Sequence, residues 1–437
     1  MNITVAPRRF DETVRIPASK SHTIRRLLVA SFAEGVSKID YPLDSLDARS
    51  CLSICRALGA RIWETKDSKG GLERWTVRGT GGAKGLKRRT DLDVSPILDV
   101  GNSGTSLFLA LAMASLGDEP FTFTGDEQIA RRSAAPLLEA LAGLGVDVRS
   151  GKNGCIPVTA RGPWRGGRVS VECPTSQYLS ALLLAAPLAP AGTLTEIDVP
   201  LLNEKPYIGM TLSYLDRQDI AYKKKDDFSY FAIRGGSAYV PINGAVSADF
   251  SSAAFPACAA AVSRGKTVLL GLDPNDSQGD KAFFDMLGKM GCDVKWEPSA
   301  DGGMKVTVEG GTRLRGGRFD LNDTPDMLPA AAVLAAFADG ETRLENVAHA
   351  RIKETDRIAA MAAELGKLGV DCTELPDGLV IRGGKIPSGG LADGHGDHRI
   401  VMALAVCGLG AAAPITVTTT EAADITYPGF LSLLEIN

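Results

Sequence analysis

The chain has 437 residues, 44% of them hydrophobic, so it is long enough for two or three domains with sizeable cores. Its 48 lysines and arginines against 52 aspartates and glutamates give a formal net charge of −4 at pH 7. A slightly acidic chain is a poor partner for polyanions, so we expect neither nucleic-acid binding nor attachment to a membrane surface. The sequence holds no run of eighteen uninterrupted apolar residues, and therefore predicts no membrane-spanning segment.

Eight cysteines are spread along the chain without a Cys-x-x-Cys pair, which is typical of small buried residues in a reducing cytoplasm. The N-terminus is not followed by the apolar core and cleavage site of a secretory signal, so a cytoplasmic protein is expected. Cys51 and Cys55 have helical spacing but no matching ligand pair, and His395 and His398 have no third ligand at suitable spacing. We therefore expect no metal site.

A short sequence motif recurs along the chain. In it, a leucine or methionine followed by a glycine ends a predicted helix and leads into a strand. The glycines are Gly59, Gly145, Gly291 and Gly369. Their spacings are 86, 146 and 78 residues, and a weaker member near Asp219 lies within the long gap. Glycine-rich strand pairs alternate with alanine-rich helices such as 107–116 and 330–338. The pattern predicts α/β repeats of about 70 to 90 residues.

The first segment that could hold an anion is 17–26, where Ser19, Lys20 and Ser21 lead into an apolar run. Serines at a helix start cap its amides, and the free amides with the helix dipole favour an anion, to which Lys20 adds a full charge. The segment predicts a phosphate site. An ordinary cap with a solvated lysine is the alternative.

Two further segments precede helices. Residues 100–106 carry glycines that allow backbone amides to approach a ligand, although they match neither the Rossmann nor the Walker A pattern. The stretch 125–132 ends in Arg131 and Arg132 before a helix expected to start near Ala134. Arginine suits bidentate capture of a carboxylate or phosphate, so one of the pair is a candidate ligand-binding residue, whereas a solvent-facing pair is the alternative.

A hydroxyl cluster and an acid also stand at predicted helix starts. Thr175, Ser176 and Gln177 open a helix that begins near Tyr178. Asp326 lies at the entrance of an alanine-rich helix. An acid at that place caps amides or, when desolvated, takes a proton from a hydroxyl.

The densest charge lies in residues 353–357 (KETDR), and Asp397-His398-Arg399 follows some forty positions later. On a helix or its first turn, Lys353 and Arg357 are i and i+4 and share a face, while Glu354 points elsewhere. This predicts cations that hold anions and a carboxylate that is left for proton transfer. A solvated surface helix with ion pairs is the alternative.

These segments, in this order, resemble the enolpyruvyl transferases from Pro17 to Pro428. The resemblance implies an α/β fold of two lobes, each an inside-out α/β barrel of three βαβαββ repeats, with the active site in the cleft between the lobes. By the same resemblance, residues 1–15 plus 244–437 form the first lobe and residues 16–243 form the second.

The branch of the family with this pattern moves the enolpyruvyl group of phosphoenolpyruvate to the 5-hydroxyl of shikimate 3-phosphate and releases phosphate, in chorismate and aromatic amino acid biosynthesis. The resemblance implies addition followed by elimination, no cofactor and a monomeric enzyme. It assigns catalysis to Asp326 as proton acceptor, to Glu354 at the other proton transfer, and to Lys20. The implied shikimate 3-phosphate contacts are Lys20, Ser21, Arg25, Thr175, Ser176, Gln177, Asp326 and Lys353. The implied phosphoenolpyruvate contacts are Lys20, Gly104, Arg132, Gln177, Arg357 and Arg399.

Three positions depart from the family pattern. Phe108 stands where an arginine is usual, Ile425 where many members have a lysine, and Glu204 where many have a hydroxyl residue near the substrate phosphate. Each change weakens anion binding where the group is desolvated. Two alternatives stay open: a transferase with another acceptor, and a silent homologue that binds phosphorylated ligands. The branch that acts on a UDP-sugar is less well matched, because its mobile loop carries a cysteine and residues 117–132 contain none.

Overall fold

The computed structural model describes residues 1–86, 97–299, 303–311 and 313–434. The chain divides into two compact units: unit 1 is Met1–Ser19 with Ser247–Asn437, and unit 2 is Lys20–Val246. The two boundaries between the units, after Ser19 and after Val246, lie a few residues later than the lobe boundaries expected from the sequence. Within the described ranges, no helix has both the length and the apolar character needed to cross a bilayer.

Unit 2 has three four-stranded sheets among its described residues, with the orders β14-β3-β5-β4, β6-β7-β9-β8 and β10-β11-β13-β12. In each sheet the first pair of strands is parallel and the other pairs are antiparallel. The strands are β3 Val36–Asp40, β4 Arg61–Lys66, β5 Leu72–Arg78, β6 Ile97–Asp99, β7 Phe121–Thr124, β8 Asp147–Ser150, β9 Val158–Arg161, β10 Gly167–Ser170, β11 Leu194–Asp198, β12 Tyr222–Lys224, β13 Tyr230–Arg234 and β14 Asn243–Ala245.

Unit 1 repeats this arrangement in two four-stranded sheets, β16-β17-β15-β2 and β19-β21-β23-β22, and in the three-stranded sheet β1-β25-β24. A short pair, β18-β20, is added in the described part of the unit. The strands are β1 Asn2–Val5, β2 Thr13–Arg15, β15 Lys266–Leu270, β16 Asp293–Pro298, β17 Met304–Glu309, β18 Leu314–Arg315, β19 Arg318–Asp320, β20 Ala338–Asp339, β21 Glu341–Glu345, β22 Asp371–Leu375, β23 Gly378–Arg382, β24 Gly390–Ala392 and β25 Ile415–Thr418.

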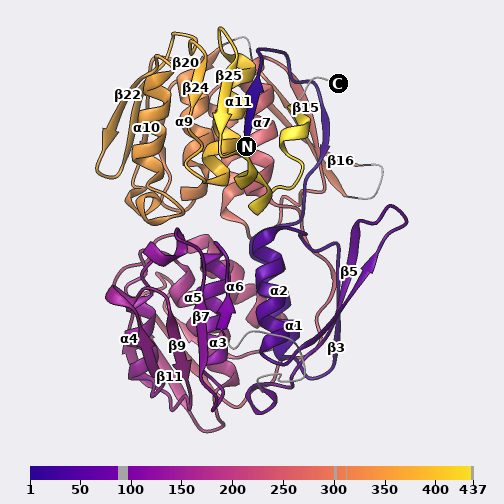
Figure 1. The fold of residues 1–437 in the computed structure, drawn as a ribbon, viewed down its shortest axis with the longest axis vertical. Coiled ribbons are helices and arrows are strands. Elements are labelled where there is room, and N and C mark those ends of the chain that lie inside the picture. Colours follow the sequence, from indigo (N-terminus) through magenta and orange to yellow (C-terminus); the bar gives the residue numbers. More distant parts are fainter. Residues whose placement is uncertain (87–96, 300–302, 312, 435–437) are drawn as a thin grey trace. The chain divides into compact units, whose positions relative to one another are not determined.

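The chain enters and leaves unit 2 directly after two short strands, each of which pairs within its own unit. Strand β2, which precedes the first helix of unit 2, pairs in parallel with β15 of unit 1. Strand β14, which precedes helix α7 (Phe250–Ser263) of unit 1, pairs in parallel with β3 of unit 2. The N-terminal β1 pairs antiparallel with β25 and so completes the last repeat, as the indigo and yellow strands show in Figure 1. The predicted α/β fold of βαβαββ repeats is confirmed.

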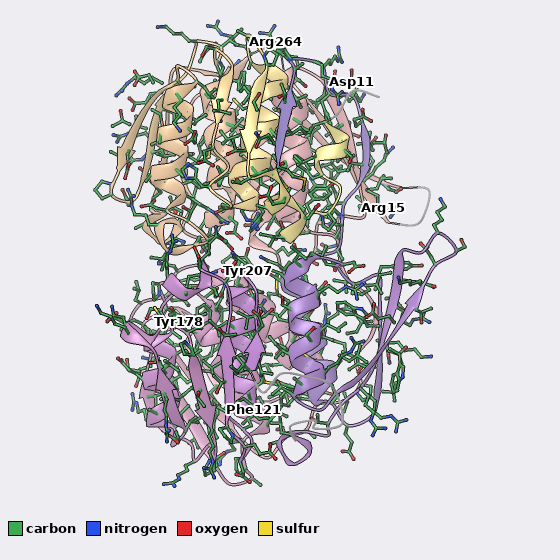
Figure 2. All side chains as sticks on the ribbon, viewed as in Figure 1. Asp11, Arg15, Phe121, Tyr178, Tyr207 and Arg264 are labelled. Carbon is green, nitrogen blue, oxygen red and sulfur yellow. The ribbon has the colours of Figure 1, made fainter. Side chains whose placement is uncertain are left out.

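Each repeat has one buried helix and most have a second, half-exposed one. The alanine-rich helices α7, α9 and α11 form the core of unit 1, and α1, α3 and α5 form that of unit 2, because small side chains let buried helices approach closely. Figure 2 labels Tyr178 on α5 and Tyr207 on α6. The helices are α1 Lys20–Phe32, α2 Leu46–Ala57, α3 Gly104–Ala114, α4 Ala135–Gly143, α5 Gln177–Ala185, α6 Lys205–Arg217, α7 Phe250–Ser263, α8 Ala282–Lys289, α9 Leu328–Ala336, α10 Arg357–Lys367 and α11 His398–Gly410.

The glycines that marked the repeats follow the half-exposed helices and have left-handed backbone. Gly59 after α2 has φ +111° and Gly145 after α4 has φ +96°. In the weaker member of the pattern, Asp219 takes the same place after α6 with φ +52°. A left-handed residue at this position satisfies the last carbonyls of the helix and turns the chain into the next strand.

Candidate active site

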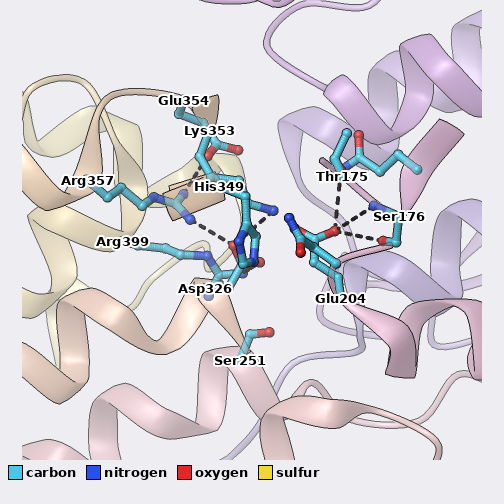
Figure 3. A network of polar contacts seen from close by, with 12 residues as sticks. Thr175, Ser176, Glu204, Ser251, Asp326, His349, Lys353, Glu354, Arg357 and Arg399 are labelled. Atoms are coloured by element: carbon cyan, nitrogen blue, oxygen red, sulfur yellow. Dashed lines mark hydrogen bonds and ion pairs between the residues drawn. The ribbon is translucent and has the colours of Figure 1, made fainter. Parts of the chain in front are cut away.

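In unit 1, three cations converge on the carboxylate of Asp326, which lies in the 3-10 turn Pro325–Met327 before α9. Arg357 Nη1 donates to Asp326 Oδ1 at 2.8 Å, and Arg399 Nη2 lies 2.9 Å from Oδ2. Lys353 Nζ lies 3.9 Å from Oδ1. Figure 3 shows these side chains pointing toward one another from separate segments of the unit. The sequence-predicted residues of this region are therefore brought together around one carboxylate.

The cations fix the protonation state of Asp326. Burial by itself raises the pKa of this carboxyl, but Arg399, Lys353 and Arg357 lower it further, so its pKa lies well below the ordinary range. Asp326 is thus ionised near neutral pH and is a weak base while all three cations face it. A ligand that draws the cations away would raise its pKa and make it a better proton acceptor.

Arg357 is the most enclosed member of the cluster, since its side chain is 0% exposed. It donates from Nε and Nη2 to Asp397 at 2.8 and 3.2 Å, and from Nη2 to Glu354 Oε2 at 2.5 Å. Burial lowers the pKa of Arg357, but Asp397, Glu354 and Asp326 outweigh it and raise the pKa above its usual value. A buried cation that faces three carboxylates is not part of a solvated surface helix, so that alternative is excluded.

The predicted geometry of residues 353–357 is wrong in two respects. Lys353 follows the 3-10 helix Ala348–Ile352, whereas α10 begins only at Arg357, so the two cations do not share a helical face. Glu354 does not point elsewhere but pairs with Arg357. The chain breaks between them because Asp356 caps α10 by accepting from the Ala359 amide at 3.0 Å.

Asp397 has a role that the sequence interpretation left unassigned. It is 0% exposed, caps α11 by accepting from the Arg399 amide at 2.9 Å, and holds Arg357 through two hydrogen bonds. One residue thus fixes both a helix start and a cation of the cluster. An aspartate directly before an apolar helix is a capping signal, but its distant partner Arg357 could not be read from sequence.

A second buried acid of unit 1, Asp280, accepts a hydrogen bond from Ser251 Oγ. Burial raises the pKa of Asp280 to about 7, and the nearby Asp326 carboxylate adds to the rise while Arg399 opposes it. Asp280 therefore titrates in the range in which most enzymes work, next to the cluster around Asp326.

In unit 2, Lys20 opens α1 and its Nζ lies 3.0 Å from Asp47 Oδ2 near the start of α2. The Ser21 carbonyl accepts from Arg25 Nη1 at 3.2 Å. Arg25 itself is 1% exposed and donates to the hydroxyls of Thr211 at 3.0 Å and Ser180 at 3.3 Å. Its pKa is lowered to about 10 by burial, against the opposing influence of Tyr214, Tyr207 and Glu204. In these hydrogen bonds, the acceptors of Arg25 are two hydroxyls and a carbonyl, and none is a carboxylate.

The Ser176 turn, formed by Thr175 and Ser176, carries three donors that meet Glu204. Glu204 Oε2 accepts from Thr175 Oγ1 at 3.3 Å, from the Ser176 amide at 3.0 Å and from Ser176 Oγ at 2.7 Å (Figure 3). Helix α5 begins directly after this turn, at Gln177, close to the predicted start. The hydroxyls expected to meet a substrate phosphate thus surround an anion that belongs to the protein.

Gly104 and Arg132 lie against each other at the start of α3. A Cβ on Gly104 would stand 2.4 Å from Arg132 Nη1, so a larger residue here would displace this guanidinium from its present position. The Arg132 guanidinium lies 5.8 Å from the centre of the Phe108 ring. Phe108, a departure from the family pattern, therefore supplies an aromatic face to the arginine beside it. Gln177 reaches this region and donates to Thr105 Oγ1 at 3.4 Å.

The fold of repeated βαβαββ units and the clusters of cations with carboxylates agree with the class of protein that the sequence resembles, the enolpyruvyl transferases. The sequence matches the EPSP synthase (3-phosphoshikimate 1-carboxyvinyltransferase) family over residues 5–434. The chain therefore belongs to the EPSP synthase family, and the predicted transfer of an enolpyruvyl group in aromatic biosynthesis is confirmed. Members of this family act on phosphoenolpyruvate and shikimate 3-phosphate.

Individual relatives agree with this assignment. The 3-phosphoshikimate 1-carboxyvinyltransferase of Acetivibrio thermocellus is 46% identical over 99% of this chain and 97% of its own length, and that of Ruminiclostridium cellulolyticum is 44% identical over 96% and 94%. The EPSP synthase structure from Acinetobacter baumannii has a TM-score of 0.80 and 28% identity, covering 99% of this chain and 97% of that one. The enolpyruvyl transferase NikO from Streptomyces tendae shares the fold, with a TM-score of 0.74 and 18% identity over 99% and 96%.

Proposed function

We propose that the clusters of the two units hold the two substrates of one enolpyruvyl transfer. Two substrates with two phosphates and two carboxylates need several cations, and both units supply them. The placement of the active site between the lobes stays a prediction. The residues proposed for shikimate 3-phosphate are Lys20, Ser21, Arg25, Thr175, Ser176, Gln177, Asp326 and Lys353. Those proposed for phosphoenolpyruvate are Lys20, Gly104, Arg132, Gln177, Arg357 and Arg399.

The convergence of Arg357, Arg399 and Lys353 on Asp326 carries this proposal. These cations are set at 2.8, 2.9 and 3.9 Å from one carboxylate, so an anionic substrate that binds them competes directly with Asp326. As Arg357 and Arg399 turn to phosphoenolpyruvate and Lys353 to the acceptor, the pKa of Asp326 rises toward its ordinary value. Substrate binding thereby turns a weak base into one able to accept the proton of the acceptor's 5-hydroxyl.

The reaction then proceeds by addition and elimination. The acceptor oxygen bonds to C2 of phosphoenolpyruvate, Asp326 takes the hydroxyl proton, and a proton is added to the methylene carbon. Elimination removes a proton from the resulting methyl group and expels phosphate, which restores the enol double bond. Glu354, paired with Arg357 at 2.5 Å, is the carboxylate proposed for the transfers at this carbon, while Lys20 stabilises the developing negative charge.

Three further properties belong to the proposal. The acids and cations named suffice for these proton transfers, so the reaction is proposed to need no cofactor or metal. The chain is proposed to act as a monomer and to bind no macromolecular partner. A cytoplasmic location fits the eight cysteines, all of which are free thiols in the structure.

Substrate-specific kinetics test the assignment with matched pairs of variants. Arg132→Gln should raise KM for phosphoenolpyruvate about tenfold or more, since one charge-assisted contact is lost, and Arg131→Gln on the exposed side of the same turn should not. Lys353→Met should mainly raise KM for shikimate 3-phosphate, with Lys385→Met as its exposed control. The assignment is wrong if each variant and its control behave alike, or if the two substrates are affected equally.

A further inference from the structure

Glu204 is held in an unusual backbone conformation. It directly precedes α6 with φ +59° and ψ +43°, in the left-handed region, and its side chain makes no capping hydrogen bond to that helix. For a residue other than glycine this conformation costs free energy, which the surrounding structure must supply. Glu204 is also 1% exposed. A helix cap therefore does not explain why a carboxylate stands at this position.

What Glu204 contacts suggests another role. A single oxygen, Oε2, accepts from two hydroxyls and one backbone amide of the Ser176 turn at 2.7 to 3.3 Å. Three convergent donors at the start of a helix are the surroundings that proteins offer to a phosphoryl oxygen. Figure 3 shows the Glu204 carboxylate in this place, with Thr175 and Ser176 directed at it. The carboxylate thus occupies the donors that the proposed function gives to the acceptor's phosphate.

Glu204 also influences a buried cation of unit 2, Arg25. Arg25 is buried among hydroxyls, and the negative charge of Glu204 favours its charged form against the effect of burial. If a phosphoryl group took the place of the carboxylate, it would meet the same three donors and the same electrostatic influence of Arg25. If the carboxylate stayed, two anions would share one buried set of donors, which is strongly unfavourable.

We propose that Glu204 is an internal occupant of the Ser176 turn, which the phosphoryl group of the acceptor must displace, and that it thereby limits the affinity for phosphorylated acceptors. This inference rests on the proposed function, because it takes Thr175 and Ser176 as phosphate-binding residues. Glu204 then acts as a specificity-determining residue: it lowers the advantage of an acceptor with a phosphoryl group over the same ring with a hydroxyl. It also keeps the donors satisfied while no ligand is bound.

Binding measurements on Glu204→Gln and Glu204→Ser test this. Glutamine keeps the size and an accepting oxygen but removes the charge, and serine empties the space. Glu196→Gln is the matched control, since Glu196 is a half-buried carboxylate on β11 of the same unit and accepts from Tyr230 Oη on β13. The dissociation constants of shikimate 3-phosphate and of unphosphorylated shikimate are measured by titration calorimetry for each protein, and melting curves confirm folding.

Both Glu204 variants should bind shikimate 3-phosphate about tenfold to a hundredfold more tightly than the wild type, the range of one charged hydrogen-bond contact. Shikimate should bind with unchanged affinity, and Glu196→Gln should match the wild type for both ligands. Unchanged or weaker binding of shikimate 3-phosphate to Glu204→Gln overturns the inference, since it would mean that the carboxylate only supports the turn. That outcome leaves the proposed function intact if the wild type still turns over shikimate 3-phosphate, whereas a wild type that neither binds nor converts it would overturn the proposed function itself.

Discussion

Replacing Asp326 by asparagine tests the account of the cluster most specifically, because the account predicts opposite effects on two steps. The carboxylate receives Arg357 at 2.8 Å and Arg399 at 2.9 Å, with Lys353 at 3.9 Å. Asparagine has the same shape and keeps one accepting oxygen, but it has no charge and cannot act as a base. The variant therefore removes the proton acceptor and also the anion that competes with substrate for the cations.

The expected magnitudes follow from these two losses. A positioned general base contributes about 10²- to 10⁴-fold, so kcat should fall by that factor, or about 2.7 to 5.5 kcal/mol of barrier. The affinity for phosphoenolpyruvate should rise, since charge-assisted hydrogen bonds of about 1.5 to 3 kcal/mol no longer tie the cations to Asp326. We expect about tenfold tighter binding, because the released cations are screened and partly paired with other groups.

Steady-state phosphate release gives kcat, and calorimetric titration gives the dissociation constant of phosphoenolpyruvate. Asp320→Asn is the control, since Asp320 is an exposed residue at the end of β19 in the same unit. A fall in kcat of less than tenfold would refute the role of Asp326 as base. Tenfold weaker binding of phosphoenolpyruvate would refute the competition between Asp326 and the substrate.

Three more perturbations follow from the geometry. Asp397→Ala should lower the free energy of unfolding of unit 1 by about 3 to 5 kcal/mol in urea titrations, because buried Arg357 loses its two hydrogen bonds to Asp397 and keeps only those to Asp326 and Glu354; a loss below 1 kcal/mol would contradict this. Gly104→Ala should raise KM for phosphoenolpyruvate with little change in kcat, since the new Cβ would lie 2.4 Å from Arg132 Nη1, and an unchanged KM would contradict the contact. Burial raises the pKa of Asp280 to about 7, whereas the unfolded value is about 3.9. The free energy of unfolding of the wild type therefore falls as pH rises from about 4 to about 7. Asp280→Asn should therefore gain stability relative to the wild type from pH 4 to pH 8 in thermal melts, and a constant difference would show that Asp280 does not titrate there.

Much of the fold was accessible from the sequence because local signals repeat. Glycine after a half-exposed helix recurs in four of the six repeats and alanine-rich buried helices recur in several, and both depend only on nearby residues. The pairing of β2 with β15 and of β14 with β3 was not visible in these signals, because strand pairing joins residues far apart in sequence. Only the resemblance to a family implied that the chain crosses between lobes.

The candidate site, too, was predicted from sequence only in part. Segments rich in hydroxyls and cations at helix starts were recognisable, whereas the acids that hold the cations were not. Asp47 and Asp397 meet Lys20 and Arg357 only after folding, across 27 and 40 positions of sequence. The start of α10 was also misjudged, although Asp356 before an apolar helical run is itself a capping signal.

The most direct test of the central claim is phosphate release from phosphoenolpyruvate by the wild-type protein, with shikimate 3-phosphate, with unphosphorylated shikimate and without acceptor. The account predicts sustained release with shikimate 3-phosphate, one phosphate for each enolpyruvyl group transferred, and no sustained release without acceptor. Binding of both substrates without turnover would show a silent homologue. Release that is equally fast without an acceptor, or sustained only with a different one, would contradict the account.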